Sequence, residues 1–125
     1  MKNRADLDLT VVTYNIHKGL SALNRRLVVH EIRDRLHALA PDVVFLQEVQ
    51  GAHLRHSRRH VTWPEGSQHQ FLTQEGGHTV YGKNASYLDG HHGNAIVSRY
   101  PILASENVDI SHHAMECRGL LHCEM

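Results

Sequence analysis

The stretch Pro41-Asp42-Val43-Val44-Phe45-Leu46-Gln47-Glu48-Val49 is the most informative segment of this sequence. Pro41 stops any helix that precedes it, and the residues from Asp42 to Glu48 form a nearly continuous apolar run that ends in two polar side chains. Such a run is typical of a strand that is buried on both faces of a parallel sheet. We therefore expect a strand over Asp42–Glu48.

Upstream, residues 9–16 (Leu-Thr-Val-Val-Thr-Tyr-Asn-Ile) are rich in β-branched and aromatic residues and predict another strand, closed by a turn at His17-Lys18-Gly19. Asn24 is a plausible N-cap for a helix that runs to about Ala40. The apolar stripe of this helix consists of Val28, Ile32, Leu36 and Leu39. Strand, helix and strand in this order predict a βαβ unit with a right-handed crossover.

Downstream, the periodicity is lost between residues 51 and 77, where we expect an excursion that could include two short helices. Short strands are expected over 79–87, 95–99, 102–108 and 119–124, with turns at Asp89-Gly90 and Tyr100-Pro101. The predicted fold class is therefore α/β, with a mixed, α+β-like sheet.

Length and charge exclude several classes of protein. The chain has 125 residues, which is enough for one core, and its 13 Lys+Arg balance 13 Asp+Glu. Zero net charge argues against a generally basic nucleic-acid coat, although it leaves room for a local phosphate site. The longest apolar runs have four residues, so no segment is expected to span a membrane, and no signal peptide is expected.

Two further residue types bear on environment and metal chemistry. Cys117 and Cys123, without a secretion signal, are interpreted as reduced thiols of a cytoplasmic protein. The 13 histidines are unusually many, yet no His-Glu-x-x-His or Cys-x-x-Cys motif accompanies them. The groups His53/His56/His60 and His91/His92 are possible donors, and the sequence does not favour a transition-metal site.

The ends of the first two expected strands carry the candidate chemistry. If these strands are parallel neighbours, about 4.8 Å apart, Asn15 and Glu48 meet at one edge of the sheet, where α/β folds place ligand sites. A carboxylate and an amide oxygen suit Mg²⁺, which keeps waters and is completed by substrate phosphate. The pattern alone is also compatible with two polar strand ends that merely face solvent.

Four segments, in order, resemble motifs of the endonuclease/exonuclease/phosphatase superfamily, which has the DNase I-like fold. They are Val12-Thr13-Tyr14-Asn15-Ile16-His17, Pro41 to Val49, Gly93-Asn94-Ala95-Ile96-Val97-Ser98-Arg99-Tyr100-Pro101-Ile102, and Arg118-Gly119-Leu120-Leu121. The resemblance implies a Mg²⁺-dependent phosphoesterase acting on a phosphodiester substrate, with Mn²⁺ as a possible substitute. It implies that Glu48 is the principal metal ligand and that Asn15 helps to hold the metal or the phosphate.

The resemblance also suggests residues around the phosphate. Arg118 matches a family arginine near the phosphate, where a guanidinium can donate two hydrogen bonds, or else it is a solvated residue at a strand start. Asn94, after His91-His92-Gly93 in an expected turn, could border the pocket or simply form the turn. His17 stands where some family members have an acidic residue. Tyr81 could approach the phosphate or belong to the core.

The family's later motifs, Gly-Asp-x-Asn and Ser-Asp-His, do not occur in this sequence; Asp109-Ile110-Ser111-His112-His113 has similar letters in another order. We therefore expect residues 1–8 to be a tail and residues 9–125 to be the N-terminal half of a four-layer α/β sandwich, inactive by itself. The exposed sheet face of such a half could be covered by a second copy or by the missing C-terminal half.

Two questions of function stay open at this level. A non-catalytic binding or assembly module that keeps half of the fold is the alternative to the enzyme. Among substrates, nucleic acid is weakly favoured over lipid or inositol phosphate, because Arg55, Arg58 and Arg59 with neighbouring histidines form a basic run after Glu48. Runs of this kind are also common on solvated helix faces.

Overall fold

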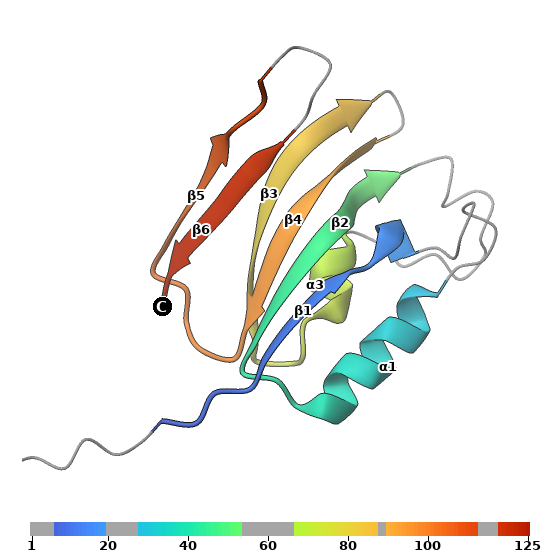
Figure 1. Cartoon of the computed structure of the whole chain (residues 1–125). Helices are drawn as coiled ribbons and strands as arrows, with labels where there is room; N and C mark the ends of the chain where they lie inside the picture. The colour runs from blue at the N-terminus through green and yellow to red at the C-terminus, as the bar shows by residue number, and fades with distance from the viewer. Residues whose placement is uncertain (1–6, 20–27, 54–66, 88–89, 113–117) are drawn as a thin grey trace, which may run out of the picture.

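The computed structural model describes residues 7–19, 28–53, 67–87, 90–112 and 118–125. The elements in these ranges, in chain order, are β1 (Val11–Asn15), the 3₁₀ turn η1 (His17–Gly19), α1 (Val29–Leu39), β2 (Val43–His53), α3 (Gln68–Leu72), β3 (His78–Tyr87), β4 (Gly90–Ser98), β5 (Ala104–Asp109) and β6 (Gly119–Glu124). This strand-rich, mixed arrangement confirms the predicted fold class (Figure 1).

The main sheet of the described residues has the strand order β1-β2-β4-β3. β1 and β2 are parallel, as predicted, with Val11 opposite Val43 and Asn15 opposite Gln47. β4 pairs antiparallel with both β2 and β3. The parallel pair therefore needs the crossover through α1, whereas β3 and β4 form a hairpin.

Strand β2 departs from the prediction in length and in burial. It continues to His53, with register shifts between Leu46 and Val49 and again between Gln50 and Ala52. It is also not buried on both faces, because Phe45 is 39% exposed. The reason is that α1 and α3 cover only the face that carries Val44 and Leu46.

Strand β4 begins earlier than predicted. His91, His92, Gly93 and Asn94 were expected in a turn, but they lie within the strand. The first three pair with both β2 and β3, and Asn94 pairs with Gly82 of β3. Gly93 is needed there because a Cβ at this position would collide with the carbonyl oxygen of Gly82 on β3. A glycine inside a strand often marks such a close approach of two backbones.

Helix α1 is shorter than predicted. It begins at Val29, because Val28 is non-helical and donates its N–H to the carbonyl of Gly19 over 2.8 Å. The predicted cap, Asn24, lies outside the described residues. The helix ends at Leu39, followed by Ala40 in the left-handed conformation and then Pro41, as expected. Leu39 is exposed, so the buried stripe is Val29, Ile32 and Leu36.

The hydrophobic core lies between the sheet and the two helices, which lie on the same side of it (Figure 1). The core consists of Ile16, Val29, Ile32, Leu36, Val44, Leu46, Val49, Leu72 and Ala95, with Val12, Val28, Phe71, Tyr81 and Val97 packed against it. The short helix α3 is held here through Leu72, whose carbonyl lies 3.1 Å from Nε2 of His37 on α1. None of the helices in the described part of the chain is long and apolar enough to cross a bilayer.

The hairpin of β5 and β6 packs against the other face of the sheet over β3 and β4. Asn107 donates from Nδ2 to the carbonyl of Lys83, and Ser98 donates from Oγ to Sδ of Met125. The hairpin shields Ile96, whereas Val11 and Phe45 on the β1–β2 side of this face are more exposed. The expected uncovered apolar surface is therefore present on that side.

Candidate functional site

The candidate site lies at the carboxyl end of β1, beside the bulge in the middle of β2 that carries Glu48. The parallel register sets Asn15 opposite Gln47, and the N–H of Ile16 donates to the carbonyl of Gln47 over 3.0 Å. Glu48 follows directly on the neighbouring strand. The predicted juxtaposition of Asn15 and Glu48 is thus a consequence of the βαβ unit.

The turn after Asn15 has an uncommon backbone. His17, Lys18 and Gly19 have φ values of 48°, 57° and 72°, all in the left-handed region, and the N–H of His17 donates to Oδ1 of Asn15 over 3.0 Å. This region costs non-glycine residues on the order of 1 kcal/mol each and persists only where surrounding contacts enforce it. The amide oxygen of Asn15 keeps a second lone pair for another partner.

Glu48 is strained in the same way. It has φ 52° and lies in the bulge between Leu46 and Val49, and its Oε2 is 3.1 Å from Nδ1 of His17. The two side chains are 42% and 71% exposed, so solvent and ligands can reach the carboxylate. Bulges of this kind are over-represented next to active sites because they re-aim a side chain. His17 therefore contacts the predicted metal ligand directly.

Asn94 lies on β4 opposite the bulge, between the pairs Leu46–Ala95 and Val49–Gly93. Its Nδ2 donates to the carbonyl of Gly119 over 3.3 Å, which connects the sheet to the start of β6. Arg118 is the residue before Gly119, and its N–H donates to Oγ of Ser111 over 2.9 Å. The backbone of Arg118 is thus fixed near Asn94, and its side chain is exposed.

Two further residues share the electrostatic environment of this edge. Burial, and then the nearby charge of Lys18, lower the pKa of His92, while the carboxylate of Glu48 partly opposes this shift. Lys18 and Glu48 therefore both lie close enough to act on the charge of His92. From the sequence, His92 is expected in a turn and as a possible metal donor, and Lys18 in another turn. Their proximity could not be predicted locally, because it depends on the pairing of β2 with β4.

Tyr81 is not brought to this group. The register pairs it with Ala95, one position beyond Asn94, so it lies on the helix-covered face of the sheet. Its ring stacks on His69 with centroids 5.1 Å apart, and its hydroxyl is 3.0 Å from Nδ1 of His91. The core interpretation of Tyr81 is the one that this environment supports.

The oxygen donors of this site, a carboxylate and an amide, have the chemistry that Mg²⁺ takes. Among the described residues, no group of three or more His, Cys, Asp or Glu side chains could enclose a metal ion. One reachable carboxylate beside an amide oxygen suits an ion that keeps several waters and takes further oxygens from a substrate phosphate. Of the histidines weighed as metal donors, His56 and His60 lie outside the described residues, as do Arg55, Arg58 and Arg59.

Two residues singled out in the sequence lie in the later part of the chain. Asp109 accepts the N–H of Ser111 over 2.9 Å, and this bond holds the pKa of its carboxyl below the usual range. It is thus the last residue of β5, and its side chain holds the start of the connection to β6. Cys123 is a free, half-buried thiol whose pKa is raised by burial, and Cys117 lies outside the described residues.

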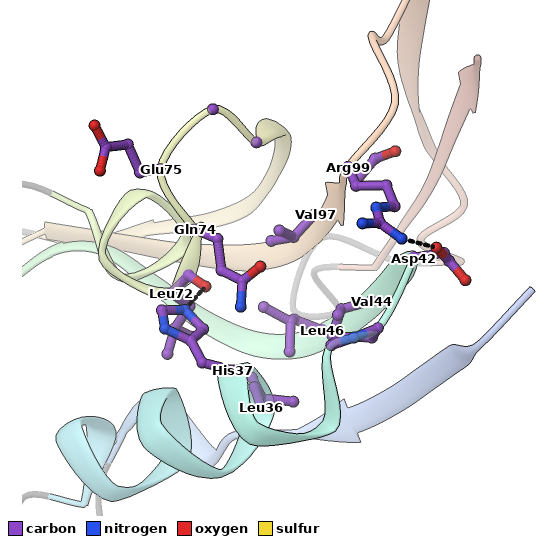
Figure 2. A pocket seen from close by; sticks show the side chains of 14 residues that line it. Leu36, His37, Asp42, Val44, Leu46, Leu72, Gln74, Glu75, Val97 and Arg99 are labelled. Atoms are coloured by element: carbon purple, nitrogen blue, oxygen red, sulfur yellow. Dashed lines mark hydrogen bonds and ion pairs between the residues drawn. The ribbon is translucent and has the colours of Figure 1, made fainter.

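A concave region lies away from this site, toward the start of β2 (Figure 2). It is a cavity of about 210 Å³ with an apolar floor that includes Leu36, Val44 and Leu46. At its rim, Arg99 donates from Nη1 to Oδ1 of Asp42 over 2.9 Å, and the N–H of Thr10 donates to Oδ2 over 2.7 Å. Both carboxylate oxygens of Asp42 are thus used inside the fold.

The sequence profile of the Endonuclease/Exonuclease/phosphatase family matches residues 12–124. The chain belongs to this family. It is 47% identical over 116 residues to the uncharacterized protein YbhP of Escherichia coli strain K12, and equally to that of Shigella flexneri. The match covers 92% of the chain and 46% of each relative, so the chain spans about half the length of the curated relatives it matches.

Solved structures show the fold of this endonuclease/exonuclease/phosphatase chain independently. An endonuclease/exonuclease/phosphatase from Beutenbergia cavernae aligns with TM-score 0.64 at 22% identity, covering 92% of the chain and 33% of that structure. A family protein from Leptotrichia buccalis aligns with TM-score 0.63 at 14% identity, covering 93% and 49%. The DNase I-like architecture is thereby confirmed for the matched part.

Proposed function

We propose that this chain supplies the metal-holding edge of a Mg²⁺-dependent phosphoesterase that hydrolyses phosphodiester bonds. Membership of a family that includes nucleases and phosphatases supports the reaction class. The observation that carries the proposal is the placement of Glu48 on a strained bulge beside Asn15, with its carboxylate reachable from solvent. Strained, solvent-facing acidic groups at the carboxyl edge of a sheet are typical of ligand sites.

In this proposal Glu48 is the principal ligand of the ion, and Asn15 contributes its amide oxygen. Bound Mg²⁺ would neutralise the phosphate and stabilise charge on the leaving oxygen. His17 holds the carboxylate of Glu48 in the absence of the ion, and it must yield or share that oxygen when the ion binds. Asn15 keeps its orientation through the bond from the N–H of His17.

Cationic and amide groups nearby would bind the rest of the phosphate. Asn94 borders the bulge on β4, and Lys18 lies in the turn after Asn15. Arg118 follows as a guanidinium that can donate two parallel hydrogen bonds to phosphate oxygens. We assign these three residues to substrate binding, while Tyr81 supports the sheet from the other face.

Metal titration tests the proposal directly. We expect Mn²⁺, as a probe for Mg²⁺, to bind the chain and to bind the Glu48→Gln variant about 100-fold more weakly, because an amide replaces the charged ligand. Glu106→Gln, on the exposed strand β5, is the matched control and should retain the affinity of the parent chain. Equal affinities of the Glu48 variant and the parent would contradict the proposal.

We propose further that the 125-residue chain alone hydrolyses phosphodiesters far more slowly than a longer chain that carries the family's later motifs. Glu48 and Asn15 hold an ion but provide no group that activates water. Turnover of a chromogenic phosphodiester by the chain alone, compared with a relative of full length, tests this. Metal binding without turnover in either form would favour the alternative of a non-catalytic binding module.

Nucleic acid is the substrate that we favour among the family's classes. The support is the run of Arg55, Arg58 and Arg59, which follows β2 in the sequence. Binding of a short DNA or RNA strand should weaken steeply as salt is raised from 50 to 200 mM, and a triple Arg→Gln variant should lose most of this dependence. Salt-independent binding would favour a lipid or inositol phosphate.

The exposed part of the sheet face around Val11 and Phe45 is, in this proposal, covered in the working protein. A second copy of the chain or the remaining half of a longer chain could supply that cover. Size-exclusion chromatography with light scattering distinguishes the cases, because a dimer of the 125-residue chain indicates the first. A stable monomer at high concentration argues against self-association.

A further inference from the structure

Gln68 is a buried polar residue outside the group of predicted site residues. It is the first residue of α3 and is 1% exposed, and both ends of its side-chain amide are bonded to backbone. Oε1 accepts the N–H of Gln50 over 2.8 Å, and Nε2 donates to the carbonyl of Lys18 over 2.7 Å. A buried amide with both ends satisfied in this way is rigid and expensive to disturb.

The two backbone segments that Gln68 joins are those that carry the proposed ligands. Lys18 lies in the left-handed turn three residues after Asn15, and Gln50 lies two residues after Glu48. Three of the four non-glycine residues with positive φ in the described chain, His17, Lys18 and Glu48, lie in these segments. The side chain of Gln68 therefore spans the two strained stretches from the core side.

The packing around Gln68 leaves it little freedom. A Cβ on Gly19 would collide with Nε2 of Gln68, so the glycine allows the amide to approach the turn. Four residues along α3, Leu72 is buried in the core and is tied to His37 of α1. The contacts of Leu72 therefore fix α3 against the core, and with it the amide of Gln68.

We infer that Gln68 is a positioning residue that sets the separation of Asn15 and Glu48 and thereby the geometry of the metal site. This inference rests on the proposed function for its consequence, metal affinity, but not for its structural content. Outer residues that orient metal ligands typically change affinity 10- to 100-fold when they are altered. We expect loss of the two hydrogen bonds of Gln68 to weaken Mn²⁺ binding by about 10-fold.

The test compares Gln68→Met with Leu72→Val in the full 125-residue chain. Methionine keeps the length of the side chain but makes neither hydrogen bond, whereas the Leu72 variant loosens the same helix and leaves both bonds. Two measurements are made: Mn²⁺ affinity, and the φ-sensitive couplings of His17, Lys18 and Glu48 by NMR without metal. We expect only the Gln68 variant to change the couplings and to weaken Mn²⁺.

Gln68→Glu provides a second variant that separates the two bonds and serves if the methionine variant does not fold. Its carboxylate can still accept the N–H of Gln50 but cannot donate to the carbonyl of Lys18. We expect the couplings of His17 and Lys18 to change more than that of Glu48. Unchanged couplings in whichever Gln68 variant folds would overturn the inference, as would equal effects of the Leu72 variant.

The outcomes also separate this inference from the proposed function. If the parent chain fails to bind Mn²⁺, or if Glu48→Gln binds it as well as the parent, the proposed function fails. In that case the NMR couplings measured without metal still show whether Gln68 positions Glu48. If the couplings change but Mn²⁺ affinity does not, the positioning role in the metal site is overturned while the metal site stands.

Discussion

Two carboxylates lie at opposite ends of the segment of β2 that pairs with β1, and their environments contrast. Asp42, before the strand, is 8% exposed, accepts hydrogen bonds from Thr10 and Arg99, and lies on ordinary backbone. Glu48, near the other end, is half-exposed, contacts the ring of His17 and lies on strained backbone. A carboxylate whose oxygens all have hydrogen-bond donors stabilises the fold. A solvent-exposed carboxylate on strained backbone is available to a ligand.

The largest expected effect concerns the glycines at these two ends. Gly19 and Gly76 have φ 72° and 78°, but a Cβ on Gly19 would collide with Gln68 and lie 2.9 Å from Cβ of Val29, whereas one on Gly76 meets nothing within 4 Å. We expect Gly19→Ala to lower the free energy of unfolding by about 3 kcal/mol and Gly76→Ala by about 1 kcal/mol, measured in urea. Equal losses would show that packing at the site end is loose.

A smaller loss of stability is expected when the pH is lowered, through His69 on α3. Burial, and then the charge of His91, lower the pKa of His69 on α3 to about 4. The folded state therefore favours the neutral ring, so its stabilisation is complete above pH 6.5 and is lost as the pH falls toward 4. Because the ring is partly exposed, we expect a loss of about 2 kcal/mol across this window.

Chemical denaturation at several pH values measures this loss. His69→Phe keeps an aromatic ring beside Tyr81 but cannot be protonated, so it should flatten the pH dependence in part. The remaining slope would come from His91 and His92, whose pKa values are also lowered, chiefly by burial. An unchanged slope in the phenylalanine variant would show that His69 does not contribute.

Neutralising each carboxylate tests the contrast between Asp42 and Glu48 itself. The bond from the N–H of Thr10, followed by that from Arg99, holds the pKa of Asp42 below its usual range. The resulting stabilisation is present above the unfolded pKa and is lost as the pH falls through the folded value. At pH 7, Asp42→Asn should therefore lower the melting temperature, while Glu48→Gln should not. The reverse order would invert the roles assigned to the two ends.

The smallest effect is expected from the exposed partner of Glu48. His17→Ala should change the free energy of unfolding by less than about 0.5 kcal/mol, because exposed ion pairs contribute little. It should, however, strengthen Mn²⁺ binding slightly, because the carboxylate of Glu48 no longer has to give up its contact with the His17 ring when the ion binds. A marked loss of affinity would instead identify His17 as a ligand, and calorimetric titration distinguishes the two.

The site could be predicted in part from local signals. Neighbouring residues predict where the first strand ends, the turn at Gly19 and the end of the helix before Pro41. Parallel pairing of β1 with β2 then brings Asn15 close to Glu48. Motif resemblance also gave the family. The predicted turn before Ala95 was wrong because Gly93 reads locally as a turn residue, while the actual cause of the glycine is the close backbone of Gly82.

The sequence by itself determined the family, the α/β class and the identity of the acidic and amide groups at the strand ends. Only the tertiary structure decided which carboxylate is satisfied and which is reachable, and only it brought Gln68 between Lys18 and Gln50. The physical reason is the separation along the chain over which each kind of interaction acts. Propensity and periodicity act over a few residues, whereas burial and hydrogen-bond partners depend on contacts between segments as far as 57 positions apart in the chain.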